Sequence, residues 1–134
     1  GDIFSIRIAG NVTSPKVLGS LEYGCAVAGA KLILVMGHTG CGAVATAVNA
    51  VSSSQSAMQV TGCQHLDFVV SDIQQSIDPE TCVQISELSA SERQAYMDGV
   101  ARRNVLASIR EITQQSEPLS VLIRDGRVAI VGSM

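Results

Sequence analysis

The five consecutive apolar residues Leu32–Met36, followed at once by the glycine-rich stretch G-H-T-G-C-G-A-V, restrict the possible folds most. A short apolar run of this kind is typical of a strand that is covered on both faces, as in a parallel sheet. Residues 43–51 are mostly small and apolar and predict a helix. A strand, a glycine-rich turn and a helix in this order indicate an α/β fold.

The segment before this run predicts one more strand and one more helix. Residues 2–10 are short, rich in isoleucine and bounded by Gly10-Asn11, which is typical of a strand. Thr13 or Ser14 then precedes Pro15 as a helix cap, and apolar residues recur at helical spacing up to Gly29. The order strand, helix, strand, helix predicts a mostly parallel β-sheet flanked by helices.

The remaining sequence continues this pattern. Residues 52–59 form a polar loop, residues 66–77 predict a helix that ends at Asp78-Pro79, and a long helix begins at Ser89 or Ser91 and runs through Ile112. Residues 119–134 allow a hairpin across Asp125-Gly126, but a helix over 117–124 followed by a strand over 127–132 is favoured. No internal repeat or linker divides the chain, so residues 1–134 constitute one domain.

Composition excludes several classes of protein. The chain has 134 residues, 46% of them hydrophobic and 16% charged, which favours a packed core over disorder. A net charge of −3 and a single basic doublet, Arg102-Arg103, argue against nucleic acid as a partner. No apolar run reaches the ~18 residues of a membrane span, and no signal peptide is visible. The irregular spacing of four cysteines suits reduced thiols and a cytoplasmic location.

His38 and Cys41, three residues apart among glycines, are the first candidates for chemistry. A phosphate-binding loop needs G-x-x-x-x-G-K-[ST] or G-x-G-x-x-G, and neither pattern is present. A cysteine nucleophile at a strand-to-helix turn is a second possibility, but the glycines that flank such a nucleophile in glutaminases are replaced by Thr39 and Ala43.

A zinc site is the third interpretation of this pair. An imidazole and a thiolate can converge on one tetrahedral ion where a strand end meets a helix start, and Gly37, Gly40 and Gly42 let the backbone approach it. Taken by itself, H-x-x-C is equally consistent with a packed histidine beside a small buried cysteine.

The wider sequence resembles the β-class carbonic anhydrases. The segments GDIFSIRIAGN and SLEYGCAVAGAKLILVMGHTGCGAV are similar to that family's G-D-[IL]-F-x-x-R-N-A-G-N, S-[LI]-E-Y and G-H-[ST]-x-C-G-A motifs, in the same order. Arg103-Asn104-Val105 and the final DGRVAIVGSM resemble its late helix and strand. The resemblance covers nearly the whole chain.

The resemblance implies zinc-dependent, reversible hydration of carbon dioxide to bicarbonate. In that family two cysteines and a histidine bind zinc and a water molecule takes the fourth position; matched by motif, His38 and Cys41 are two of these ligands. It also implies a homodimer or higher oligomer, and a place near the metal for Gly10 and Asn11, which are candidate substrate-binding residues. Related proteins on the same scaffold hydrolyse carbon disulfide or carbonyl sulfide, so the substrate stays open among these.

The sequence departs from the family's pattern in one important respect. The family's first zinc cysteine, and its aspartate and arginine, belong to a C-x-D-x-R segment that precedes G-D-[IL]-F and is absent here, so the catalytic pair is unknown. Cys25, Cys63 and Cys82 match no ligand position and are expected to be buried or partly buried thiols. Ile8 also replaces the family's asparagine.

Because of this difference from the family, we interpret the chain as a fragment of a longer gene product and not as a degenerate paralogue. The fragment should hold two zinc ligands and have little activity by itself. The alternative function is a non-catalytic carbonic anhydrase-like module; a membrane partner is expected only if such a module is fused to an anion transporter. The family's missing strand is central, so we expect the neighbouring strands to close up and pair, giving at least three parallel strands.

Other polar residues have plainer expectations. His65 is expected to be a surface residue at a helix start, and Glu22 and Tyr23 to be structural. Asp2 and Arg7 are expected to form a surface charge pair, with a direct role in the site as the alternative.

Overall fold

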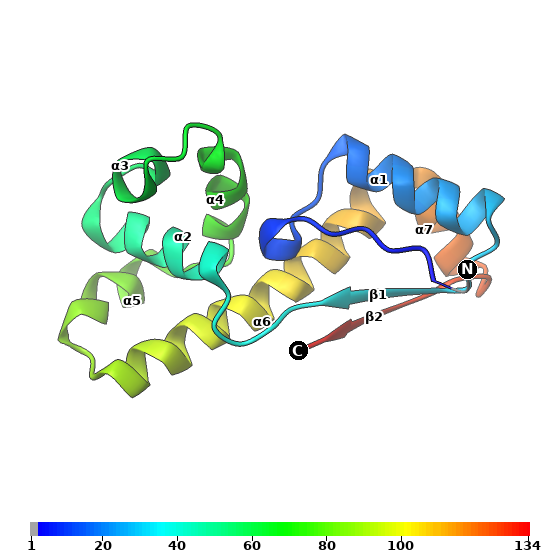
Figure 1. The fold of residues 1–134 in the computed structure, drawn as a ribbon. Coiled ribbons are helices and arrows are strands. Elements are labelled where there is room, and N and C mark those ends of the chain that lie inside the picture. The colour runs from blue at the N-terminus through cyan, green and yellow to red at the C-terminus, as the bar shows by residue number, and fades with distance from the viewer. Residues whose placement is uncertain (1–2) are drawn as a thin grey trace.

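The computed structural model describes residues 3–134, and in this range the sheet consists of two parallel strands, β1 (Leu32–Met36) and β2 (Ala129–Ser133). Leu32 pairs with Ala129 and Met36 with Ser133, so the strands are in register over their whole length. Figure 1 shows the two strands side by side at the lower right of the molecule, with helices above them and to their left. The predicted α/β fold with a parallel sheet flanked by helices is confirmed.

The long helix α6 (Ala90–Gln115) crosses the molecule and packs against the sheet. It begins at Ser89, whose hydroxyl accepts from the backbone N–H of Glu92 while the Glu92 carboxylate accepts from the backbone N–H of Ser89. Val105 of α6 lies against both Gly37 and Gly132, where an added Cβ would approach a Val105 methyl to 2.7 Å. The two glycines therefore allow the helix to approach the sheet closely.

Helices α1 (Pro15–Glu22) and α7 (Glu117–Arg124) lie together over one face of the sheet, above the strands in the view of Figure 1. Each starts at a serine that caps it: the hydroxyl of Ser14 accepts from Val17 N and that of Ser116 from Leu119 N. A π-helical turn, Tyr23–Val27, continues α1. The buried core here consists of Leu18, Cys25, Ile33, Val35, Val105, Ile112, Leu119, Leu122 and Val128.

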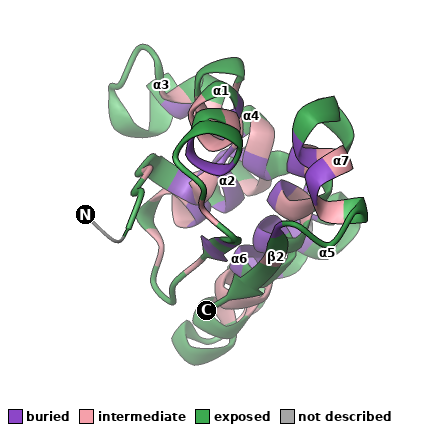
Figure 2. Ribbon diagram, turned by 90° about the vertical axis from the view of Figure 1, so that its right-hand side faces the viewer, coloured by how far each residue is buried: buried purple, intermediate pink, exposed green. Residues whose placement is uncertain are grey.

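A cluster of helices lies beyond the carboxyl ends of the strands, around α2 (Gly42–Ser53), which directly follows the glycine-rich turn. It comprises α3 (Ala57–Thr61), α4 (Leu66–Gln74), α5 (Pro79–Val83) and a 3-10 turn, Gln84–Glu87. Their apolar sides pack together with the first turns of α6, and Figure 2 shows this burial on the inward sides of the helices.

Most predicted helices are confirmed, including the C-terminal helix and strand that were favoured over a hairpin. The polar loop predicted over 52–59 is partly wrong because α3 begins at Ala57. The hydroxyl of Ser56 accepts from Gln59 N, and the Gln59 side chain accepts from Ser56 N, a reciprocal cap that stabilises a short helix in this polar stretch.

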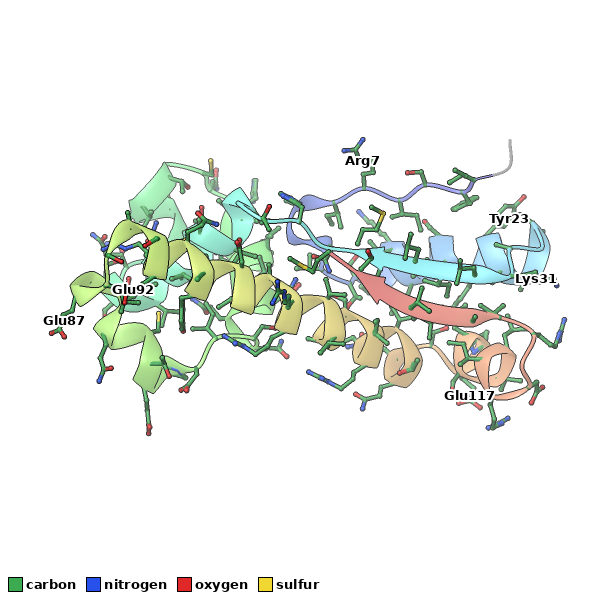
Figure 3. The ribbon with its side chains drawn as sticks, turned by 90° about the horizontal axis from the view of Figure 1, so that it is seen from below. Arg7, Tyr23, Lys31, Glu87, Glu92 and Glu117 are labelled. Atoms are coloured by element: carbon green, nitrogen blue, oxygen red, sulfur yellow. The ribbon has the colours of Figure 1, made fainter. Side chains whose placement is uncertain are left out.

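The strand predicted over residues 2–10 is wrong. Residues 3–8 have no regular secondary structure and lead into a 3-10 turn, Ala9–Asn11, although they run beside β1 in the same direction (Figures 1 and 3). A strand needs a hydrogen-bonded neighbour, and among the described residues β1 pairs with β2 instead. A β-favouring composition alone therefore does not produce a strand here.

The expected closure to three or more parallel strands is also wrong. That expectation assumed that unpaired backbone groups would be buried. Residues 3–8 lie at the surface, with Ile3 85% and Ile8 43% exposed, so water can reach the backbone of this segment. The free-energy cost that would drive the two segments together is therefore small.

β1 is covered on one face only, which contradicts the expectation from its apolar run. Ile33 and Val35 are buried, whereas Leu32, Leu34 and Met36 are 55%, 50% and 62% exposed. β2 is almost entirely exposed, as Figure 2 shows. The open face of the sheet is thus apolar and solvent-accessible in this chain.

Candidate metal centre

The turn between β1 and α2 holds both predicted metal ligands at the carboxyl end of the strand. The N–H of Gly37 donates to the carbonyl of Ser133 at 2.9 Å, so β pairing continues one residue beyond β1. The backbone then turns through Gly40 at φ +64°, a conformation that favours glycine. Cys41 is the N-terminal cap of α2, and its carbonyl accepts from Ala45 N at 2.9 Å. The strand end and the helix start thus place His38 and Cys41 on one short turn.

His38 is exposed, and its ring is held by a single backbone contact. Nδ1 lies 3.0 Å from the carbonyl oxygen of Thr39. Since a carbonyl oxygen can only accept, Nδ1 must carry the proton in this bond. The lone pair of the neutral imidazole is then on Nε2, the arrangement by which a backbone carbonyl commonly orients a metal-binding histidine.

Cys41 is half-buried and unpaired, and it lies at the N-terminus of the 12-residue helix α2. The unsatisfied N–H groups of a helix start favour a negatively charged group there. A soft thiolate and an imidazole nitrogen are the donors that zinc prefers. The chemistry of this donor pair therefore fits zinc.

The described residues bring no third donor to this pair. Within residues 3–134, no group of three or more histidine, cysteine, aspartate or glutamate side chains is placed to hold a metal ion. A tetrahedral zinc ion bound here would have two of its four donors on this turn.

The other three cysteines lie elsewhere. Cys25 and Cys82 are buried, and burial raises the pKa of both thiols, which keeps them protonated. Cys82 Sγ donates to the Val48 carbonyl at 3.5 Å. Cys63 is exposed between α3 and α4, so the expectation of a buried or partly buried thiol is wrong for this residue. Its glycine and threonine neighbours, which offer no apolar cover, were the signal for exposure.

Gly10 and Asn11, the candidate substrate-binding residues, form a turn that is hydrogen-bonded to two side chains of α6. Asn104 Nδ2 donates to the Gly10 carbonyl at 2.6 Å, and Ser108 Oγ donates to the Asn11 carbonyl at 2.8 Å. Both turn residues have positive φ, 67° and 43°. A Cβ on Gly10 would lie 2.6 Å from Ile73 Cδ1, so the turn fits tightly between α4 and α6.

The remaining candidates lie apart from the turn that carries His38 and Cys41. His65 is exposed at the start of α4, as expected. Glu22 accepts from Ser116 Oγ at 2.6 Å and so links α1 to α7, and the ring of Tyr23 lies 6.3 Å from that of Phe4. Arg7 points away from the sheet and helices (Figure 3), and Asp2 lies outside the described residues.

Two residues of α6 that contact the candidate site were not identified from the sequence. Asp98 Oδ1 accepts from the N–H of Gly40, between the two ligands, at 3.1 Å. Asn104 donates to the Gly10 carbonyl, and the motif Arg103-Asn104-Val105 by itself gives no sign of this contact. Gln94 and Asp98 are one helical turn apart, and this spacing indicates that their side chains can hydrogen-bond to each other. The spacing does not indicate that Asp98 also contacts the turn at Gly40.

Comparison with known proteins agrees with these motifs. A family model described as carbonic anhydrase matches residues 1–134. The chain is 31% identical over 132 residues to Carbonic anhydrase 2 of Mycobacterium tuberculosis, in two strains, which covers 98% of this chain and 57% of those relatives. It is 44% identical over 55 residues to the carbonic anhydrase of Mycolicibacterium smegmatis, covering 41% of this chain and 27% of that protein. The chain thus spans little more than half the length of the Mycobacterium tuberculosis relatives, and it belongs to the carbonic anhydrase family.

Proposed function

We propose that the protein containing this chain catalyses the reversible hydration of carbon dioxide to bicarbonate at a zinc ion bound by His38 and Cys41. The observation that carries the proposal is the turn itself: an Nδ1–H bonded to Thr39 leaves Nε2 for the metal, and the thiol of Cys41 stands at the start of α2. The names of the relatives support carbon dioxide over carbonyl sulfide or carbon disulfide as the substrate.

In this proposal the residues of the turn have separate tasks. The Thr39 carbonyl fixes the tautomer and the plane of the His38 ring. The first turn of α2 stabilises the charge of the Cys41 thiolate. When bound, zinc supplies a Lewis acid that lowers the pKa of water from 15.7 to about 7.

Gly10 and Asn11 are proposed to border the route of the substrate. Their backbone is immobilised by Asn104 and Ser108, so this edge keeps its shape without help from the substrate. The missing zinc donor is proposed to come from a further cysteine of the protein, in keeping with the resemblance to the β-class enzymes.

We also propose that the protein acts as a homodimer or larger assembly. The open face of the sheet presents Leu32, Leu34 and Met36 to solvent, and Ile3 and Phe4 are exposed beside it. An apolar surface of this kind is typical of a region that is covered in an assembly.

In the described residues, no helix is both long and apolar enough to span a membrane.

The metal assignment is tested by elemental analysis of the full-length protein and of its His38→Ala and Cys41→Ser variants. We expect about one zinc per wild-type subunit and a severe loss in both variants, since each removes one of the few protein donors. His65→Ala and Cys63→Ser are matched controls, because they change the same residue types at exposed positions outside the turn. Unchanged zinc content in both test variants would refute the assignment.

The activity is tested in parallel by stopped-flow hydration of carbon dioxide with a pH indicator. We expect the wild-type protein and both controls to be active, and the two ligand variants to be inactive. A full-length protein that binds zinc through His38 and Cys41 but does not hydrate carbon dioxide would refute the proposed reaction and leave the metal site standing.

A further inference from the structure

We propose that Asp98 is a positioning residue for the metal site, and that its carboxylate sets the geometry of the turn that carries His38 and Cys41. This inference rests on the proposed function, because it assigns a role relative to the zinc ligands named there. Asp98 does not itself belong to a group of metal-binding side chains within the described part of the chain.

The central observation is one hydrogen bond between distant segments. Asp98 Oδ1 accepts from the backbone N–H of Gly40 at 3.1 Å, across 58 positions of sequence. Gly40 lies between the two ligands and has φ +64°. Fixing its N–H direction fixes the peptide plane that joins Thr39 to Gly40, and this plane determines how the chain passes from the imidazole to the thiol.

The carboxylate is itself held in place. Gln94 Nε2, one turn earlier on α6, donates to the same Oδ1 atom at 2.8 Å. Next to Asp98 on the helix, Val100 is fully buried and Ala101 is 4% exposed, so this part of α6 is anchored in the core. The acceptor that meets Gly40 therefore lies on a rigid element, at the surface, with Gln94 as a second partner.

The other contacts of the turn do not perform this task. The bond from His38 Nδ1 to Thr39 is local and moves with the turn, and the bond from Gly37 N to Ser133 precedes His38. Among the described side chains from other elements, the carboxylate of Asp98 is the one that bonds to the backbone between the two ligands. It also places a negative charge near the N-terminus of α2, where such charge is favourable.

The test uses cobalt(II) as the probe in the full-length protein, because a thiolate bonded to cobalt gives a charge-transfer absorption band. The part of this band that Cys41→Ser removes reports ligation by Cys41. Asp98→Ala is expected to weaken cobalt affinity by about 10- to 100-fold, the usual loss for a residue that orients a metal ligand. Asp98→Asn keeps a side-chain oxygen that can accept from the Gly40 N–H. Its cobalt affinity is therefore expected to stay within about threefold of wild type. Glu87→Ala removes an exposed carboxylate before α6 and serves as the control (Figure 3).

Thermal unfolding of the metal-free proteins separates positioning from folding. If Asp98→Ala does not fold, Asp98→Asn and Gln94→Ala provide the test, and Gln94→Ala is expected to weaken cobalt binding about threefold, because the carboxylate loses one partner. Wild-type affinity and an unchanged charge-transfer band in folded Asp98→Ala would overturn the inference, as would an equal loss of affinity in the Asn and Ala variants. These results leave the proposed function intact, whereas a wild-type protein without a Cys41-dependent cobalt band would refute the proposed metal site itself.

Discussion

The side-chain amide of Asn104 donates a hydrogen bond of 2.6 Å to the carbonyl oxygen of Gly10, 94 positions earlier in the chain. Asn104 is 3% exposed, and its Oδ1 accepts from Ser76 Oγ at 3.5 Å. A buried side chain in the middle of α6 thus joins the first segment and the residues just after α4. No backbone N–H donates to the Gly10 carbonyl in the described hydrogen bonds. We therefore expect the Asn104 side chain to stabilise the fold through this contact.

We expect Asn104→Ala to lower the free energy of unfolding by about 1–3 kcal/mol, because the buried Gly10 carbonyl loses its donor. Urea denaturation of the full-length protein measures the change. Asn49→Ala is the matched control, since Asn49 is exposed on α2 and its side chain makes no hydrogen bond among the described residues. Equal stability of the two variants would contradict the prediction.

Gly37→Ala and Gly132→Ala are each expected to destabilise the protein by about 1–3 kcal/mol through overpacking. In both cases the new methyl group would lie 2.7 Å from a methyl group of Val105. Combining either change with Val105→Ala should recover part of the loss, because the nearest clashing methyl is removed, while Met134 Sδ at 2.8 Å from the Gly37 position and Ile109 Cδ1 at 3.0 Å from the Gly132 position remain. Thermal unfolding measures both effects.

Gly19→Ala is the control for these glycine variants. Gly19 lies inside α1, and nothing lies within 4 Å of an added Cβ, so alanine there should raise stability by about 0.5–1 kcal/mol. If Gly37→Ala behaved like Gly19→Ala, the close approach of α6 to the sheet would be disproved.

Stability should fall in alkaline solution, partly because of Cys82. Burial raises the pKa of its thiol above the ordinary value of 9.0, so the folded state keeps this proton to a higher pH than the unfolded state. The resulting stabilisation is complete below pH 9.0 and is lost as the pH rises through the folded-state pKa, with a slope of at most about 1.4 kcal/mol per pH unit.

Urea unfolding at about pH 8 and about pH 10 tests this slope. The loss of stability between the two should be smaller in Cys82→Ala than in wild type, whereas Cys63→Ser, which changes an exposed thiol, should match wild type. An identical pH dependence in Cys82→Ala would show that the buried thiol does not contribute.

The full-length protein should be a dimer or larger in solution, because the exposed apolar face around Leu32, Leu34 and Met36 favours association. Light scattering at micromolar concentration measures the mass. A clean monomer would refute the prediction.

The 134-residue chain on its own should hydrate carbon dioxide no faster than buffer, because its described residues offer the metal two donors. Stopped-flow measurement with added zinc tests this. Zinc-dependent hydration that a chelator abolishes would show that His38 and Cys41 suffice.

Elements with local signals could be predicted from the sequence alone. Ser116 marks one helix start, and Thr13 or Ser14 and Ser89 or Ser91 mark two others. In the structure the caps are Ser14, Ser89 and Ser116, whose hydroxyls each accept from the backbone N–H three residues later. The apolar run Leu32–Met36 marks β1 within its observed bounds. The pair His38 and Cys41, read with the surrounding motifs, identified the candidate site and the family.

Which segments meet depends on the tertiary fold and could not be predicted from local patterns. Residues 3–8 have the composition of a strand but no paired neighbour, and β1 has an apolar run but one open face. The contacts of Asp98 with Gly40 and of Asn104 with Gly10 join residues 58 and 94 positions apart. Strand pairing and burial depend on neighbours that are distant in sequence, so local patterns cannot specify them; the packing of α6 against the sheet and the two turns does.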